Sequence, residues 1–150
     1  VLNGGLGTPA MQRYDRDILA QRGVSAVVIF EGVNDLGSIN GNSEAMAAKL
    51  IEAYQQLAKK ARERGYKVYG ATITPFAGHS YFTFFREAAR QAVNEWIRTS
   101  GTFDDVIDFD KLMRDPSETS KLKADLQDDW LHPNAAGYKV MGEYAAKIIK

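Results

Sequence analysis

Residues 26–30 have the sequence Ala-Val-Val-Ile-Phe and lead directly into Glu31-Gly32-Val33-Asn34-Asp35-Leu36-Gly37. Five consecutive apolar residues make both faces of this segment apolar. Such a run, followed by a turn that contains glycine, is typical of a strand buried on both faces in a parallel sheet. The stretch therefore predicts a buried parallel strand with polar residues immediately after its end.

The rest of the chain alternates between helical and strand patterns. We expect helices over residues 10–22, 43–64, 83–99 and 135–149, and further strands over 1–3, 67–72 and 106–109. Strands separated by helices of this length imply a parallel sheet with helices on both faces. We therefore predict one α/β domain over residues 1–150. In the helix over 83–99, the periodicity predicts that Phe85, Ala89, Val93 and Trp96 face inward.

The composition limits the classes of partner. The chain has 19 basic and 19 acidic residues, so its formal charge is zero, and we expect neither a nucleic acid nor an anionic membrane as partner. The longest apolar stretch, residues 25–30, is far shorter than the ~20 residues of a membrane span. The absence of cysteine excludes disulfides, thiol catalysis and cysteine metal sites, and leaves secreted and cytoplasmic locations both open.

The first candidate site residues follow the strand over 26–30, in Gly32-Val33-Asn34-Asp35. In a parallel α/β sheet, the ligand site lies beyond the carboxyl ends of the strands. One interpretation is structural, because Asn and Asp favour tight turns and cap helices. The other is that the Asn34 amide donates a hydrogen bond to a developing oxyanion. The loop alone leaves both interpretations open.

The second candidate is Asp129-Trp130-Leu131-His132, followed by Pro133 and the last helix. A carboxylate three residues before a histidine can accept a hydrogen bond from its Nδ1, which leaves Nε2 free as a general base. The alternative is a surface histidine beside an Asp that caps the helix. The chain has only two histidines, and His79 has no carboxylate near it in sequence.

Together the two motifs resemble the blocks of the SGNH (GDSL-like lipase/acylhydrolase) superfamily. The third block of that family is Gly-x-Asn-Asp, here residues 32–35, and its fifth is Asp-x-x-His, here residues 129–132. Residues 13–20, 71–75, 86–97 and 106–109 are also similar to bacterial members. The resemblance covers essentially the whole chain from residue 10 onward.

The resemblance implies a three-layer α/β/α sandwich with a flavodoxin-like parallel sheet, and hydrolysis of a small-molecule acyl ester through an acyl-enzyme without metal or cofactor. It makes His132 the general base, Asp129 its orienting partner, and Asn34 an oxyanion donor. Gly7 is the glycine of the family's second, oxyanion block in one alignment; in the other alignment that glycine is missing. The acyl ester is left open between an acetylated carbohydrate, a lipid and an aryl ester.

The chain departs from the family where the nucleophile belongs. The first block, Gly-Asp-Ser, ends a first strand that lies in the middle of the family's sheet. None of the serines present follows a Gly-Asp pair: they are Ser25, Ser38, Ser43, Ser80, Ser100, Ser117 and Ser120. We therefore expect the domain to be incomplete at its N-terminus. An N-terminal peptide outside this numbering, or a swapped neighbour, is expected to fill the place of the first strand.

Two other functions compete with the hydrolase. The first is a catalytically inactive, hydrolase-like binding protein that keeps the pocket without the serine. The second is a dinucleotide-binding domain, because Gly5-x-Gly7-x-x-Ala10 precedes a helix and Glu31 follows the next strand. That interpretation requires a strand before Gly5, and it leaves the Asp129 and His132 pair unexplained.

Overall fold

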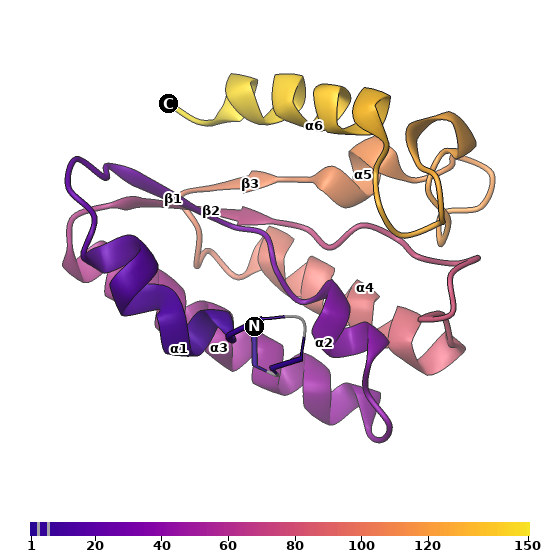
Figure 1. Ribbon diagram of the computed structural model, residues 1–150, viewed down its shortest axis with the longest axis horizontal. Helices are drawn as coiled ribbons and strands as arrows, with labels where there is room; N and C mark the ends of the chain where they lie inside the picture. Colours follow the sequence, from indigo (N-terminus) through magenta and orange to yellow (C-terminus); the bar gives the residue numbers. More distant parts are fainter. Residues whose placement is uncertain (3, 6) are drawn as a thin grey trace.

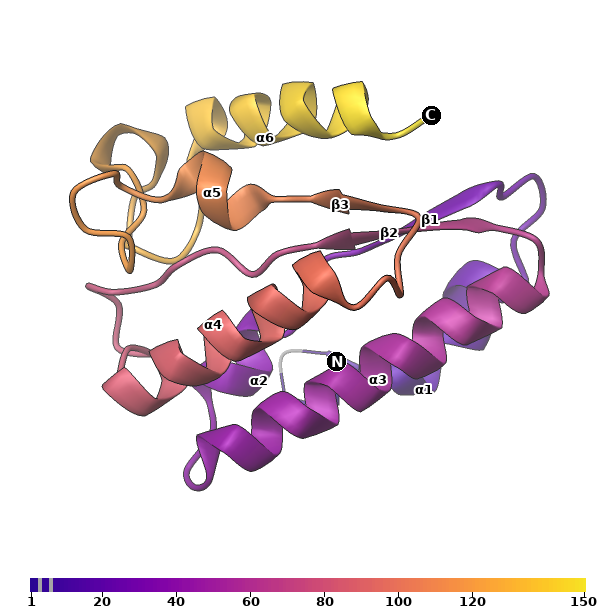
Figure 2. The same ribbon diagram turned by 180° about the vertical axis from the view of Figure 1, so that it is seen from behind.

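The computed structural model describes residues 1, 2, 4, 5 and 7–150, and it forms three layers (Figure 1). The middle layer is a parallel sheet of β1 (Ala26–Ile29), β2 (Lys67–Ala71) and β3 (Asp105–Ile107), in the order β1-β2-β3. Helix α6 (Ala135–Ile148) covers one face of the sheet. The other face is covered by α1 (Ala10–Tyr14), α3 (Ser43–Glu63) and α4 (Phe84–Thr99) (Figure 2). The predicted α/β class with a parallel sheet is therefore confirmed.

Four short elements complete the fold. Helix α1 continues as a π-helical turn, η1 (Asp15–Leu19), so the predicted helix over 10–22 ends earlier than expected. Helix α2 (Val33–Gly37) follows β1, α5 (Phe109–Met113) follows β3, and the 3-10 turn η2 (Ala124–Leu126) precedes α6. Among the described residues, no helix is both long and apolar enough to cross a membrane.

Side-chain caps fix where the longer helices begin. Asn42 accepts a hydrogen bond from the Ala45 N–H before α3, Thr83 from the Arg86 N–H before α4, and Asn134 from the Gly137 N–H before α6. Each cap satisfies a backbone donor that the first turn of a helix leaves without a partner. The helix predicted over 83–99 consequently begins one residue later, with Thr83 as its cap.

Two predicted strand segments are wrong. Val1 and Leu2 do not form a strand; the Leu2 N–H donates to the Asp35 carboxylate (2.9 Å) instead of to a neighbouring strand. Asn3, the third residue of that predicted strand, lies outside the described residues. Phe109 is not the end of a strand but the first residue of α5, because the Asp108 carboxylate accepts from the Lys111 N–H and starts a helix there.

The sheet separates two apolar cores. On the side of α3 and α4, Val27, Ile29 and Val68 pack with Leu50, Tyr54 and Leu57. On the side of α6, Tyr69, Ala71 and Ile107 pack with Met113 and Met141. The buried stripe of α4 contains Ala89 and Val93 as predicted, and Trp96 is partly buried against it. Phe85 is 80% exposed, so the expectation that it faces inward is wrong.

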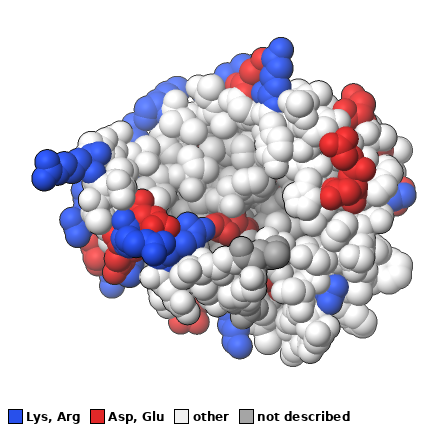
Figure 3. Space-filling model, viewed as in Figure 1, with Lys and Arg blue, Asp and Glu red and all other residues white. Residues whose placement is uncertain are grey.

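Strand β1 lies at one edge of the sheet and is less buried than its sequence predicts. Its Val27 and Ile29 side chains are buried, but Val28 is 41% exposed and Phe30, just after the strand, is 42% exposed. Figure 3 shows an uncharged, hollowed area on this face of the molecule, below α6. Since these two side chains remain exposed, the expectation of burial on both faces is wrong within the described residues.

Candidate functional site

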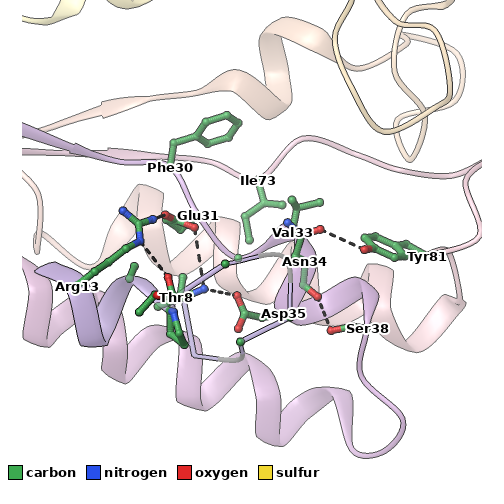
Figure 4. Close-up of a pocket in the computed structure, with 17 residues that line it drawn as sticks. Thr8, Arg13, Phe30, Glu31, Val33, Asn34, Asp35, Ser38, Ile73 and Tyr81 are labelled. Carbon is green, nitrogen blue, oxygen red and sulfur yellow. Dashed lines mark hydrogen bonds and ion pairs between the residues drawn. The ribbon is translucent and has the colours of Figure 1, made fainter. Parts of the chain in front are cut away.

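A cavity of about 420 Å³ opens where β1 ends, between α1 and α2 (Figure 4). It is lined on one side by Gly7, Thr8 and Arg13, and on the others by Glu31, Asn34, Ser38, Ile73 and Tyr81. The structure thus brings two of the predicted site residues, Asn34 and Gly7, to one cavity. Asp129 and His132 do not line it, although their loop lies at the same end of the sheet (Figure 1).

Gly32 sets the turn that carries Asn34. Its φ of 104° is a conformation that residues with a side chain rarely adopt, and a Cβ there would lie 2.8 Å from the Tyr54 hydroxyl. The Tyr54 hydroxyl donates to the Glu31 carbonyl (2.5 Å). Burial of the Tyr54 side chain raises its pKa, so the hydroxyl stays protonated. Only glycine therefore fits the first position of Gly-x-Asn-Asp, and the packing around it fixes the start of α2.

Asn34 lies in the first turn of α2 with its side chain exposed. Its Oδ1 accepts a hydrogen bond from the Tyr81 hydroxyl (3.1 Å), while its backbone carbonyl accepts from the Ser38 hydroxyl (2.6 Å). Among the described residues, no acceptor takes a hydrogen bond from Nδ2. The predicted loop is therefore a short helix that no side chain caps, and the Asn34 amide is available as a donor.

Gly7 has no structural requirement for glycine. Its backbone lies outside the left-handed region, and a Cβ there would meet no atom of the described residues within 4 Å. The open space around this backbone leaves room for a ligand at the cavity wall. The oxyanion role given to Gly7 by one alignment stays a prediction.

Asp129 and His132 form the predicted pair. The His132 Nδ1 lies 2.7 Å from Asp129 Oδ2, and the other carboxylate oxygen accepts from the backbone N–H groups of His132 (2.7 Å) and Leu131 (3.0 Å). These hydrogen bonds, the one from the His132 N–H foremost, hold the pKa of Asp129 well below its usual range. Asp129 does not cap α6, because Asn134 does. The arrangement therefore fits an oriented imidazole with Nε2 free of any described partner.

The backbone between the two residues bends sharply. Trp130 has a φ of 65°, and no other non-glycine residue in the described part of the chain has a positive φ. Its N–H donates to Gln127 Oε1 (2.5 Å), and its indole packs over Gly78, where an added Cβ would lie 2.7 Å away. The bend folds His132 back onto Asp129, and it is held by Gln127 in the same segment and by Gly78 in the loop after β2.

A buried ion network supports the loop after β2. The Arg90 guanidinium and the Asp110 carboxylate are both fully buried and lie 2.7 Å apart. Arg90 also donates to the Ile73 carbonyl (2.8 Å), and Asn94 Oδ1 accepts from the Ile73 N–H (2.7 Å). Since Ile73 lines the cavity, α4 and α5 together fix one of its walls.

The sequence did not point to Arg90 or Asp110, and it did not connect Tyr81 with Asn34. Arg90 and Asp110 are 20 residues apart, and Tyr81 and Asn34 are 47 apart, so no local spacing connects either pair. An arginine on the buried face of a helix is the one signal that was available, because such a charge requires a partner.

No described serine is placed as the nucleophile. The Ser38 hydroxyl lines the cavity but donates to the Asn34 carbonyl, and among the described residues no serine hydrogen-bonds to His132. The dinucleotide interpretation is disfavoured too, since Val1 and Leu2 form no strand before Gly5 and Arg13 pairs with the Glu31 carboxylate (3.1 Å). Within the described residues, no cluster of His, Cys, Asp or Glu is arranged to hold a metal ion.

Comparison with protein families identifies the class. Residues 3–140 match the model of the GDSL-like lipase/acylhydrolase family, and the chain therefore belongs to this family. Membership supports a hydrolase role, in agreement with the resemblance found in the sequence. No curated protein matches the chain.

Solved structures show the same fold. A GDSL-like lipase from Bacteroides thetaiotaomicron VPI-5482 is similar to 92% of the chain, with 18% identity and a TM-score of 0.70. A protein assigned to the lipolytic G-D-S-L family, from Desulfitobacterium hafniense DCB-2, is similar over 93% of the chain, with 22% identity and a TM-score of 0.74. A protein assigned as an acylhydrolase, from Bacteroides fragilis NCTC 9343, is similar over 92%, with 16% identity and a TM-score of 0.69. The chain spans 67%, 73% and 66% of these structures, respectively.

Proposed function

We propose that the full-length protein is a serine ester hydrolase that cleaves small acyl esters through an acyl-enzyme. The observation that carries this proposal is the 2.7 Å contact between His132 Nδ1 and Asp129 Oδ2, in a chain of the GDSL-like family. His132 is the general base and acid, Asp129 orients it, and Asn34 and Gly7 donate to the oxyanion. Acetylated carbohydrates and lipids are the candidate substrates besides simple esters.

The proposed reaction has two steps. First, His132 Nε2 removes the proton of the serine hydroxyl as that oxygen attacks the ester carbonyl carbon, and the oxyanion accepts from Asn34 Nδ2. The tetrahedral intermediate then collapses, and the departing alkoxide takes the proton from His132. Second, His132 activates water, which releases the acid and the free serine. Asp129 stays ionised throughout, which agrees with its lowered pKa.

We propose further that the nucleophile lies in a segment that precedes Val1 and pairs with β1. The open edge of the sheet supports this, because an edge strand leaves half of its backbone N–H and C=O groups without a partner in the sheet. The exposed Val28 and Phe30 side chains fit an apolar strand and its following helix. The uncharged hollow on this face of the molecule (Figure 3) agrees with this. A swapped segment from a second copy satisfies the same edge.

Hydrogen exchange on the full-length protein tests this pairing. A strand on the open edge is expected to protect the backbone amides of all four residues of β1, Ala26–Ile29, for as long as those of β2. If alternate amides of β1 exchange rapidly, as on a free edge, no strand is paired there and the proposed location of the serine is wrong. Dependence of the protection on protein concentration would indicate the swapped neighbour.

The hydrolysis itself is tested with p-nitrophenyl acetate. The full-length protein is expected to release p-nitrophenol, and His132→Ala to lower kcat by at least about 1000-fold, since the general base is lost. Asp129→Asn should also lower kcat, whereas the matched control Asp125→Asn, an exposed carboxylate in the nearby turn η2, should not. A full rate in His132→Ala contradicts the proposed base. Saturable ester binding without hydrolysis would instead favour the inactive binding protein.

A further inference from the structure

We infer that Tyr81 is a positioning residue for the proposed oxyanion donor, fixing the orientation of the Asn34 amide through its hydroxyl. The inference rests on the proposed function, because it assigns Tyr81 a role through Asn34. The two residues are 47 positions apart, and they meet because α2 and the loop after β2 lie at the same end of the sheet (Figure 4).

The hydrogen bond from Tyr81 goes with one orientation of the Asn34 amide. The Tyr81 hydroxyl donates to Asn34 Oδ1 at 3.1 Å. An amide carries its oxygen and its nitrogen on opposite branches of one planar group, so an oxygen held at Tyr81 turns Nδ2 away from it. In the opposite orientation the Asn34 N–H would donate to the hydroxyl, and the amide oxygen would face the developing negative charge. Donation by the Tyr81 hydroxyl to Oδ1 therefore goes with the one rotamer that stabilises an oxyanion.

Tyr81 is itself held from several sides. Its ring lies against Gly37 of α2, so closely that a Cβ on Gly37 would be 1.9 Å from the ring atom Cδ2. Its backbone N–H donates to His79 Nδ1 (3.1 Å), and the His79 ring packs edge-on against it with centroids 4.7 Å apart. Its carbonyl accepts from Arg86 Nη1 (3.0 Å), and the same guanidinium donates to the Ile39 carbonyl. The hydroxyl is consequently presented from a fixed ring.

The same loop also contacts the other half of the site. Gly78, three residues before Tyr81, has a φ of 103° and packs against the indole of Trp130, which lies between Asp129 and His132 in sequence. Two glycines, Gly78 and Gly37, thus let the loop approach the His132 segment and α2 closely. The loop over residues 78–81 connects the segments of the proposed base and donor, with Tyr81 at the donor end.

The kinetic test removes only the hydroxyl. In the full-length protein, Tyr81→Phe is expected to lower kcat for p-nitrophenyl acetate about 10-fold while KM changes less than about 2-fold, since the ground state gains little from a donor aimed at the oxyanion. Tyr66→Phe, a partly buried tyrosine before β2, is the matched control and should change neither. In an Asn34→Ala background, Tyr81→Phe should have no further effect. An unchanged kcat, or an equal 10-fold loss in both backgrounds, would overturn the inference.

An NMR measurement tests the positioning without relying on activity. With the Asn34 side chain assigned by comparison with Asn34→Ala, its amide protons should move or broaden in Tyr81→Phe, and Tyr66→Phe should leave them in place. If they stay unchanged in Tyr81→Phe, the hydroxyl does not set the rotamer and the inference fails. If the wild-type protein hydrolyses no ester yet these resonances respond, the proposed function fails while the contact itself stands.

Discussion

The substitution Gly32→Ala tests whether the turn between β1 and α2 requires glycine at this position. The left-handed backbone at this residue (φ 104°) costs roughly 1–2 kcal/mol for a residue with a side chain. The new methyl group would also lie 2.8 Å from the Tyr54 hydroxyl and 3.1 Å from Ile73 Cδ1, inside a packed core, and overpacking of this kind typically costs about 1–3 kcal/mol. Alanine also restricts the unfolded chain more than glycine does, and this stabilises the folded state by about 0.4–1 kcal/mol. The expected loss is therefore roughly 1–4.6 kcal/mol.

Two other glycines separate these contributions. Gly65→Ala introduces the same kind of backbone strain (φ 77°) where a Cβ meets no described atom within 4 Å, and Gly41→Ala introduces neither strain nor contact. Urea unfolding followed by circular dichroism should rank the losses Gly32→Ala, Gly65→Ala, Gly41→Ala, with the first exceeding the second by at least about 1 kcal/mol. If Gly32→Ala is no less stable than Gly65→Ala, the close packing of Tyr54 and Ile73 against Gly32 is not what restricts this position.

Two further predictions concern the ion network below the site. Asp110→Asn removes the buried carboxylate that Arg90 and Arg98 both contact and leaves Arg90 paired with Glu87 alone, so the free energy of unfolding should fall by about 1–3 kcal/mol in urea titration. The exposed Asp125→Asn should change it by less than about 0.5 kcal/mol, and equal losses would contradict the network. Burial alone would raise the pKa of Asp108, but hydrogen bonds led by the one from Arg98 lower it to about 2. Because the folded pKa lies below the unfolded value of about 3.9, Asp108 stabilises the protein above pH 4 and this contribution is lost as the pH falls toward 2. Wild type should therefore exceed Asp108→Asn in stability at pH 6 and approach it near pH 2, and a difference that stays constant with pH would refute the assignment.

Much of the fold was predictable from local patterns. The strands at 26–29 and 67–71 and the helices that follow them appear in the sequence as apolar runs and amphipathic periods, and these are set by residues close together in the chain. Asn34, Asp129 and His132 could be proposed as site residues from the sequence because each lies within a short block. The position of β1 at the sheet edge was not, since an apolar strand has the same sequence whether or not a neighbour covers it.

The contacts that organise the site were beyond sequence reasoning for a physical reason. The hydrogen bond from Tyr81 to Asn34, the packing of Trp130 on Gly78 and the burial of Arg90 beside Asp110 all join segments from different elements. Such contacts depend on how the loops meet at the end of the sheet, which no spacing within one segment encodes. Phe85 shows the converse, because its place in the α4 period suggested burial, while in the structure it is 80% exposed in the first turn of that helix.

Whether His132 activates a serine can be tested directly by treating the full-length protein with a fluorophosphonate and mapping the adduct by mass spectrometry. A serine activated by His132 should form one covalent phosphonyl adduct, on a serine that precedes Val1, and His132→Ala should form it at least about 100-fold more slowly. The unmodified serines should include Ser38, whose hydroxyl donates to the Asn34 carbonyl. The proposed base and the proposed place of the nucleophile would be contradicted by an adduct on Ser38 or Ser80, by labelling at the same rate in His132→Ala, or by no labelling at all.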